Sequence, residues 1–122
     1  MKYFILLVAL STILLSSSDC STKKTERLKG KLEIAGICMN YTIKIIEGKV
    51  DSSLVAAKWT DETTGKTHEN VFRLGSPCTF PASIKQGDEF YFTIDTAKQK
   101  DCMVCMAYYP TPAKTVAIKV EN

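Results

Sequence analysis

The sequence predicts an all-β fold of about seven short strands, arranged as a small antiparallel OB-like barrel. Short runs of alternating apolar and polar residues recur along the chain, and clusters of Gly, Pro, Asn and Asp separate them. Beyond the N-terminal leader, no segment has the periodicity of a long amphipathic helix. An Ig-like β-sandwich is the alternative architecture. A chain of 122 residues can support one small hydrophobic core.

The N-terminus predicts export. Residues 1–18 have the three parts of a secretory signal peptide: a charged start at Lys2, an apolar run over residues 4–15, and small residues at 16–18. The apolar run is shorter than a transmembrane helix requires. Cys20 leaves a second route open, because bacterial lipoproteins begin at a cysteine that receives lipid after cleavage. We therefore expect delivery to the periplasm or cell envelope, by plain secretion or with a lipid on Cys20.

The remaining chain divides into two parts. Residues 19–27 are polar and lack apolar periodicity, which predicts a tether, and residues 28–122 form a single β-domain. Over the whole chain, 16 Lys and Arg residues face 13 Asp and Glu residues, giving a net charge of +3. This charge is too small and too mixed to indicate nucleic-acid binding. We expect membrane contact only through a lipid on Cys20.

Four strands are predicted in the first half of the domain. Leu28, Gly30 and Leu32 share one face of the first strand, while charged residues occupy the other face. A polar stretch at residues 61–66 contains the glycine that a hairpin turn requires. The four expected strands cover residues 28–34, 41–46, 53–60 and 71–74.

The second half of the domain predicts three more strands. Pro77 and Pro81 exclude a regular central strand between the two halves. Residues 89–95 show the strictest alternation in the chain, and residues 115–120 alternate again near the C-terminus. Residues 102–109 alternate less regularly, but their apolar character also predicts a strand.

The cysteines carry the most informative chemistry. Cys38, Cys78, Cys102 and Cys105 remain if Cys20 receives lipid, and four cysteines in a small exported domain predict two disulfides. On a straight strand, residues three apart point to opposite faces, which disfavours a bond between Cys102 and Cys105. We therefore expect Cys38 and Cys78 each to pair with one of these two. The sequence leaves the choice of partner open.

Two other uses of these cysteines are weaker. Cys102-x-x-Cys105 has the spacing of a thiol–disulfide redox pair, but redox proteins place the first cysteine at a helix N-terminus. Here the pair falls in an apolar, strand-like run. A zinc site would need a second close pair, and Cys38 and Cys78 lie forty residues apart. We expect no metal and no cofactor.

No catalytic constellation is present in the sequence. His68 is the sole histidine, and its place in a polar hairpin predicts an exposed side chain. Asp61 and Glu62 are expected to be solvated charges of the same hairpin. The sequence therefore predicts a protein that is not an enzyme.

A possible binding surface lies near the C-terminus. Tyr108 and Tyr109 precede a Pro-Thr-Pro sequence, and aromatic residues beside prolines can form a binding face, which Trp59 could join. We favour the interpretation that Tyr108 lies in the core, with Pro110 and Pro112 only shaping a loop. The occupant of such a surface would be a protein or a small molecule.

Three stretches, at residues 70–78, 87–92 and 101–107, resemble small exported, lipoprotein-like proteins of the Bacteroidetes. The residues before Cys20 resemble the divergent lipidation signals of the same group. This resemblance implies an envelope location and a compact β-fold. It carries no known activity, so it assigns no catalytic residues. In this group, acidic residues after the cysteine favour surface display, whereas Lys23 and Lys24 follow Cys20 here, which indicates the periplasm.

The sequence as a whole predicts an exported, non-catalytic cell-envelope domain that is stabilised by disulfides and binds an unknown ligand. The alternative function is a thiol–disulfide redox protein that acts through Cys102 and Cys105.

Overall fold

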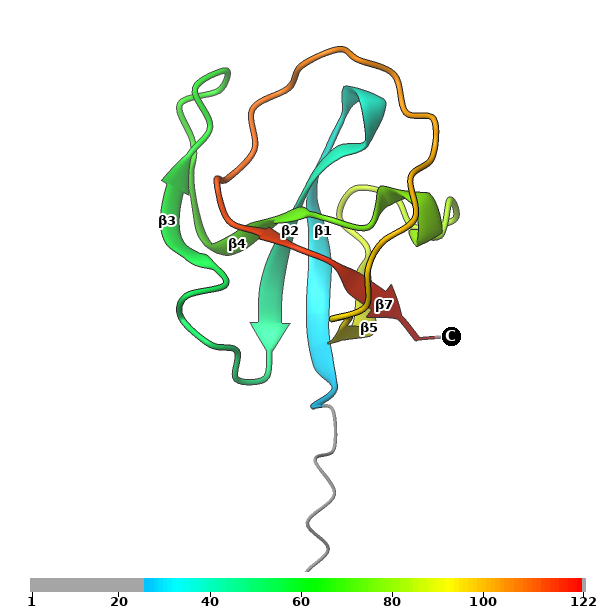
Figure 1. Ribbon diagram of the computed structural model, residues 1–122. Coiled ribbons are helices and arrows are strands. Elements are labelled where there is room, and N and C mark those ends of the chain that lie inside the picture. The colour runs from blue at the N-terminus through cyan, green and yellow to red at the C-terminus, as the bar shows by residue number, and fades with distance from the viewer. Residues whose placement is uncertain (1–25, 122) are drawn as a thin grey trace, which may run out of the picture.

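The protein is nearly all-β. The computed structural model describes residues 26–121, so the predicted signal peptide, most of the predicted tether and Cys20 lie outside the described residues. Figure 1 shows the strands and the long connection that crosses one end of the sheet. The strands are β1 (Leu28–Gly36), β2 (Asn40–Glu47), β3 (Ala56–Thr60), β4 (Thr67–Leu74), β5 (Glu89–Ile94), β6 (Thr115–Val116) and β7 (Ile118–Val120), and two short 3-10 helices are η2 (Ile37–Met39) and η3 (Pro77–Thr79).

The strands belong to one sheet. Its order is β3-β4-β2-β1-β5-β7, and every pairing along this path is antiparallel. The short strand β6 lies off this path and pairs with β4 in parallel. The predicted all-β class is therefore confirmed. A single sheet also differs from the Ig-like sandwich considered as the alternative, because a sandwich has two sheets packed face to face.

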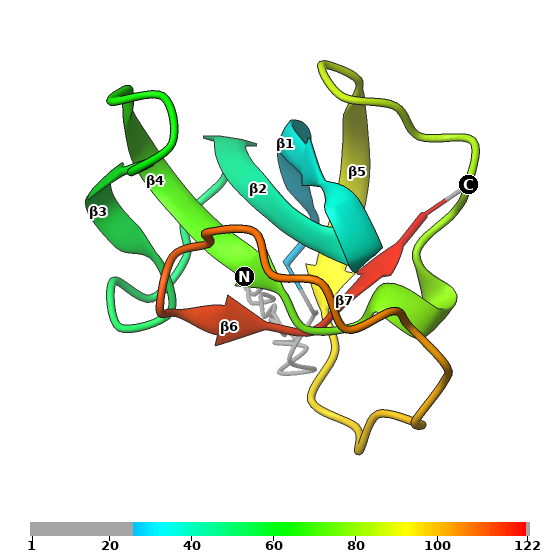
Figure 2. The same cartoon turned by 90° about the horizontal axis from the view of Figure 1, so that it is seen from above.

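The sheet is not closed into a barrel, which corrects that part of the prediction. The C-terminal segment runs between β4 and β5, as Figure 2 shows, but it divides its hydrogen bonds between them. Its first two residues pair with β4, the ladder breaks at Ala117, and the next three residues pair with β5. No strand of this segment pairs with both β4 and β5, so the sheet stays open between them.

Most of the expected strands are present, with changes at their ends. The third strand is shorter than predicted and the fourth is longer, because the hairpin begins its ladder at Thr60 and Thr67. The strand predicted over residues 102–109 is wrong: residues 95–114 contain no helix or strand. Most of the apolar residues of this segment are exposed, so their apolar character did not indicate a buried strand.

The core lies on the face of β1 that the alternation predicted. Leu28, Gly30 and Leu32 are buried, and the residues between them are only half-buried. Aromatic side chains fill the space opposite β1: Phe90 and Phe92 of β5 contact each other, and Phe72 lies 6.1 Å from Phe92 between ring centroids. The buried apolar residues are Leu28, Leu32, Ile43, Val55, Val71, Phe72, Leu74, Phe80, Phe90, Phe92, Val116 and Ile118.

The strand β1 also sets the long dimension of the molecule. Its nine residues correspond to about 30 Å of extended chain. Leu28 lies at one end of this strand, and the β1–β2 turn lies at the other, beneath the long connection of residues 95–114 (Figure 1). The first described residues and the long connection are therefore at opposite ends of the domain.

Gly30 allows the Phe92 ring to approach the backbone of β1. A Cβ atom at this position would lie 2.7 Å from Cε1 of Phe92 and 3.2 Å from Cγ2 of Ile43. Both neighbours are fully buried, so neither can move into solvent. Glycine is therefore required here by packing between the two strands.

We expect Gly30→Ala to lower the free energy of unfolding by about 1–3 kcal/mol, because the added methyl group must displace the Phe92 ring. Urea denaturation of the purified domain measures this change. Lys119→Ala, at an exposed position of β7, is the control and should change stability by less than about 0.5 kcal/mol. Equal effects of the two substitutions would show that the packing beside Gly30 is loose.

Candidate binding surface

Two disulfides fix the long connection to the rest of the domain. Cys105 pairs with Cys38, with Cα atoms 5.0 Å apart, and Cys102 pairs with Cys78, with Cα atoms 5.7 Å apart. The predicted pattern is confirmed, and the structure supplies the partner of each cysteine. Stable disulfides of this kind are typical of an oxidising, non-cytoplasmic compartment.

The pairing also bears on the redox hypothesis. A redox protein of the C-x-x-C type forms its disulfide between the two cysteines of the motif. Here Cys102 and Cys105 bond to different elements of the fold, one in η3 and one in η2. The thiol–disulfide alternative therefore loses the bond on which it depends.

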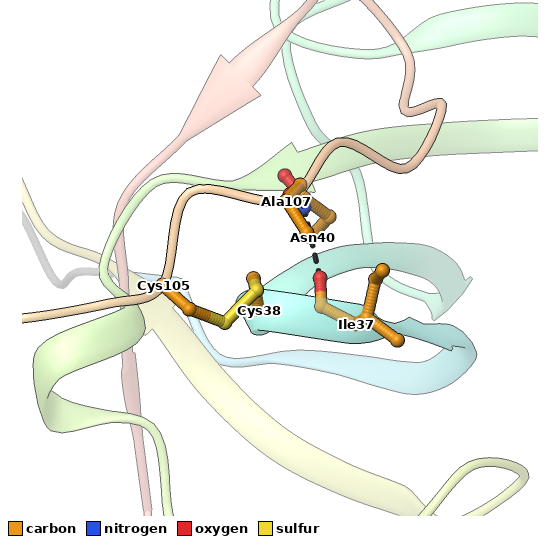
Figure 3. The surroundings of a disulfide bond; sticks show 5 residues. All are labelled: Ile37, Cys38, Asn40, Cys105 and Ala107. Carbon is orange, nitrogen blue, oxygen red and sulfur yellow. Dashed lines mark hydrogen bonds between the residues drawn. A yellow bond between two sulfur atoms is a disulfide. The ribbon is translucent and has the colours of Figure 1, made fainter.

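We name residues 101–109 the stapled loop, because both disulfides fall within it. At its C-terminal half it lies against the β1–β2 turn, as Figure 3 shows. The amide Nδ2 of Asn40 donates hydrogen bonds to the carbonyl oxygens of Ile37 (2.8 Å) and Ala107 (2.9 Å). Cys38 lies in this turn with a positive φ of 58°, and its sulfur is bonded to that of Cys105. A disulfide and a side-chain amide thus hold the same point.

The outer surface of this region is apolar. The side chains of Met103 and Met106 are 100% and 94% exposed, and Tyr108 is 75% exposed. Val104 on the loop and Ile37 on the neighbouring turn are exposed as well. We name these five residues the apolar tip. Large apolar side chains that remain in solvent on a fixed backbone are typical of interaction sites.

The expectation that Tyr108 lies in the core is wrong. Its side chain lies at the surface, where the residue is 75% exposed. Its hydroxyl group donates a hydrogen bond to Oε1 of Glu62 at 3.2 Å, and this bond raises the pKa of Tyr108. This bond links the stapled loop to the β3–β4 hairpin.

A second attachment is polar and centres on Asp61. Its carboxylate accepts hydrogen bonds from the backbone N–H of Thr63 (2.8 Å), the Thr63 hydroxyl (2.7 Å) and the Tyr109 hydroxyl (3.3 Å). Asp61 is 1% exposed, so the expectation of a solvated hairpin charge is wrong. Burial raises the pKa of Asp61, but the hydrogen bonds from Thr63 and Tyr109 outweigh it and hold the pKa below its usual value.

The third group near the hairpin is His68. Its Nδ1 atom lies 2.8 Å from Oε2 of Glu33, and only 13% of its side chain is exposed, so the prediction of an exposed histidine is also wrong. The Trp59 ring covers His68, with 5.7 Å between ring centroids. Register explains this arrangement, because Trp59 and His68 are direct cross-strand partners in β3 and β4.

The three aromatic residues of the predicted binding surface therefore have different surroundings. Tyr108 belongs to the apolar tip, Tyr109 joins the loop to Asp61, and Trp59 packs on His68 of the hairpin. Sequence reasoning missed Met103, Val104 and Met106, because their apolar side chains predicted a strand, and it assigned no role to Ile37. An available signal was the position of the methionines beside disulfide-forming cysteines, in a segment without regular alternation.

A cleft of about 490 Å³ lies beneath the stapled loop, between that loop and β4. Its walls include Arg73 and Leu74 of β4 and Val104 and Met106 of the loop. Within residues 26–121, no group of three or more His, Cys, Asp and Glu side chains could hold a metal ion. In the same range, no helix has the length and apolar character needed to cross a membrane.

Comparison of this chain with protein-family models, curated proteins and solved structures finds no match. The candidate surface therefore rests on its own geometry.

We expect Asp61→Asn to lower the free energy of unfolding at neutral pH by about 1–3 kcal/mol, because the amide leaves a donor of Thr63 or Tyr109 without its acceptor. The pKa of Asp61 is lowered by folding, so its contribution is complete above the unfolded pKa of about 3.9 and is lost as pH falls through the folded pKa. The two proteins should thus converge in acid.

Urea denaturation at a series of pH values between neutrality and strong acid measures this convergence. Asp101→Asn, at an exposed position of the stapled loop, is the matched control and should follow the unsubstituted protein throughout. A stability difference between the unsubstituted protein and Asp61→Asn that stays constant into strong acid would contradict a role for the Asp61 charge.

Proposed function

We propose that this protein is an exported, non-catalytic domain of the cell envelope that binds a partner protein through the apolar tip. The observation that carries the proposal is the exposure of Met103, Met106 and Tyr108 on a loop held by two disulfides. The partner surface would be an apolar groove that receives these side chains.

The energetics of association support this function. A flexible loop loses conformational freedom when it binds, and this loss weakens the complex. The stapled loop is already ordered by the two disulfides, by the Asn40 amide and by the bond from Tyr109 to Asp61. Methionine side chains adapt to the shape of a partner, and aromatic side chains anchor an interface. The apolar tip combines a fixed backbone with both kinds of contact.

Support for export comes from the disulfides together with the N-terminal leader. Disulfides persist in the periplasm and outside the cell, whereas the cytosol keeps thiols reduced. The sequence before the domain has the parts of a secretory signal and a cysteine, Cys20, that can receive a lipid. This order of signal, cysteine and domain fits a domain that a tether holds at the cell envelope.

Site-specific cross-linking in the host tests the binding surface. A photoreactive phenylalanine analogue replaces Tyr108, and the same analogue at Tyr91 serves as the control, because Tyr91 is an exposed tyrosine of β5. We expect a protein adduct of defined mass from position 108 and none from position 91. Adding Met106→Asp to the first chain should weaken the adduct. Identical adducts from both positions, or none from position 108, would overturn the proposed surface.

Intact mass spectrometry of the protein purified from its own host tests export and anchoring. We expect a chain that begins at Asp19, or at a lipidated Cys20, and that gains four hydrogen atoms when its two disulfides are reduced. Alkylation before reduction should leave Cys38, Cys78, Cys102 and Cys105 unmodified. A chain that still begins at Met1 would contradict export.

A further inference from the structure

The sulfur atoms of the domain fall into two chemical states. Four belong to the cysteines that form the disulfides, so they are already oxidised. The other sulfur atoms of residues 26–121 are the thioethers of Met39, Met103 and Met106. An oxidant that reaches the domain therefore meets thioethers and no free thiol within the described part of the chain.

Exposure separates these three methionines sharply. Met103 and Met106 are 100% and 94% exposed, while Met39 is half-buried and packs against the core. Cys102 and Cys105 flank Met103 and precede Met106, and both cysteines are bonded to other elements of the fold. The backbone that carries the two exposed thioethers is thus fixed to the rest of the fold by covalent bonds.

We propose that Met103 and Met106 form an oxidation site that switches the apolar tip from an apolar to a polar surface. The oxidant is a hydroperoxide. A lone pair of the methionine sulfur attacks the peroxide oxygen that carries a proton, and the O–O bond breaks. The proton of the attacked oxygen passes to the other oxygen, which leaves as water (or as an alcohol). Sulfur loses two electrons and the peroxide gains them. The product, methionine sulfoxide, is polar and is returned to the thioether by dedicated reductases.

The position of the two residues makes the change large for the surface. Met103 and Met106 are two of the five side chains of the apolar tip and the most exposed among them. Two sulfoxides would place two strong dipoles where an apolar groove of a partner would have to desolvate them. The effect on partner binding rests on the proposed function, whereas the oxidation itself does not.

Graded treatment of the purified, disulfide-bonded protein with hydrogen peroxide tests the site. Peptide mass spectrometry follows each methionine, with Met39 as the comparison within the same molecule. We expect Met103 and Met106 to gain one oxygen each about tenfold faster than Met39. Retention on a hydrophobic-interaction column should fall after oxidation. Equal rates at the three methionines, or unchanged retention after complete oxidation of Met103 and Met106, would overturn the proposal.

The double variant Met103→Leu/Met106→Leu is the matched control, since leucine keeps an apolar surface but cannot be oxidised. Its column retention should not change with peroxide. In the chain that carries the photoreactive group at position 108, peroxide should suppress the adduct, and the double leucine variant should restore it. An adduct insensitive to complete oxidation would overturn the switch. Absence of an adduct before oxidation would overturn the proposed function, and the rates and retention would still decide the oxidation site.

Discussion

The two disulfides are the constraint on which the rest of this structure depends. The connection of residues 95–114 has no regular secondary structure, and a segment of this length would ordinarily be mobile. Its apolar residues give it little packing against the core, because most of them face solvent. Bonds from Cys102 and Cys105 to two separate short helices supply the order that burial does not. In chain-entropy terms, each closure stabilises a domain by about 2–4 kcal/mol.

A polar attachment completes what the disulfides begin. Asp61 is buried at the end of the β3–β4 hairpin, and its hydrogen bonds with Thr63 and Tyr109 join the hairpin to the stapled loop. A buried carboxylate without such partners would be strongly unfavourable. The hairpin, the β1–β2 turn and the stapled loop therefore act as one rigid end of the domain, although they are distant in the sequence.

The alternation of residues predicted the strands that bury one face, because burial is what the period-two pattern reports. It predicted β1, β2 and β5 closely and failed over residues 102–109, where apolar side chains remain in solvent. The disulfide pattern was predicted correctly, but from a strand at Cys102 and Cys105 that the structure does not contain, and the partner of Cys105 depended on the place of η2 in three dimensions. Asp61 was misjudged, although aspartate side chains in turns commonly accept a hydrogen bond from the backbone N–H two residues on, as Asp61 does from Thr63. The open form of the sheet was not predicted either, because it depends on how two short strands at the end of the chain pair with β4 and β5.

The opposite placement of the first described residues and the stapled loop has a consequence for orientation. Glu26, the first described residue, precedes the Leu28 end of β1, while the loop crosses the far end of that strand (Figure 1). A lipid on Cys20 would hold the Leu28 end nearest to the bilayer. The methionines would then point away from the lipid headgroups, toward whatever faces the membrane across the compartment. Under this geometry, the domain would hold the contact surface at its end farthest from the membrane.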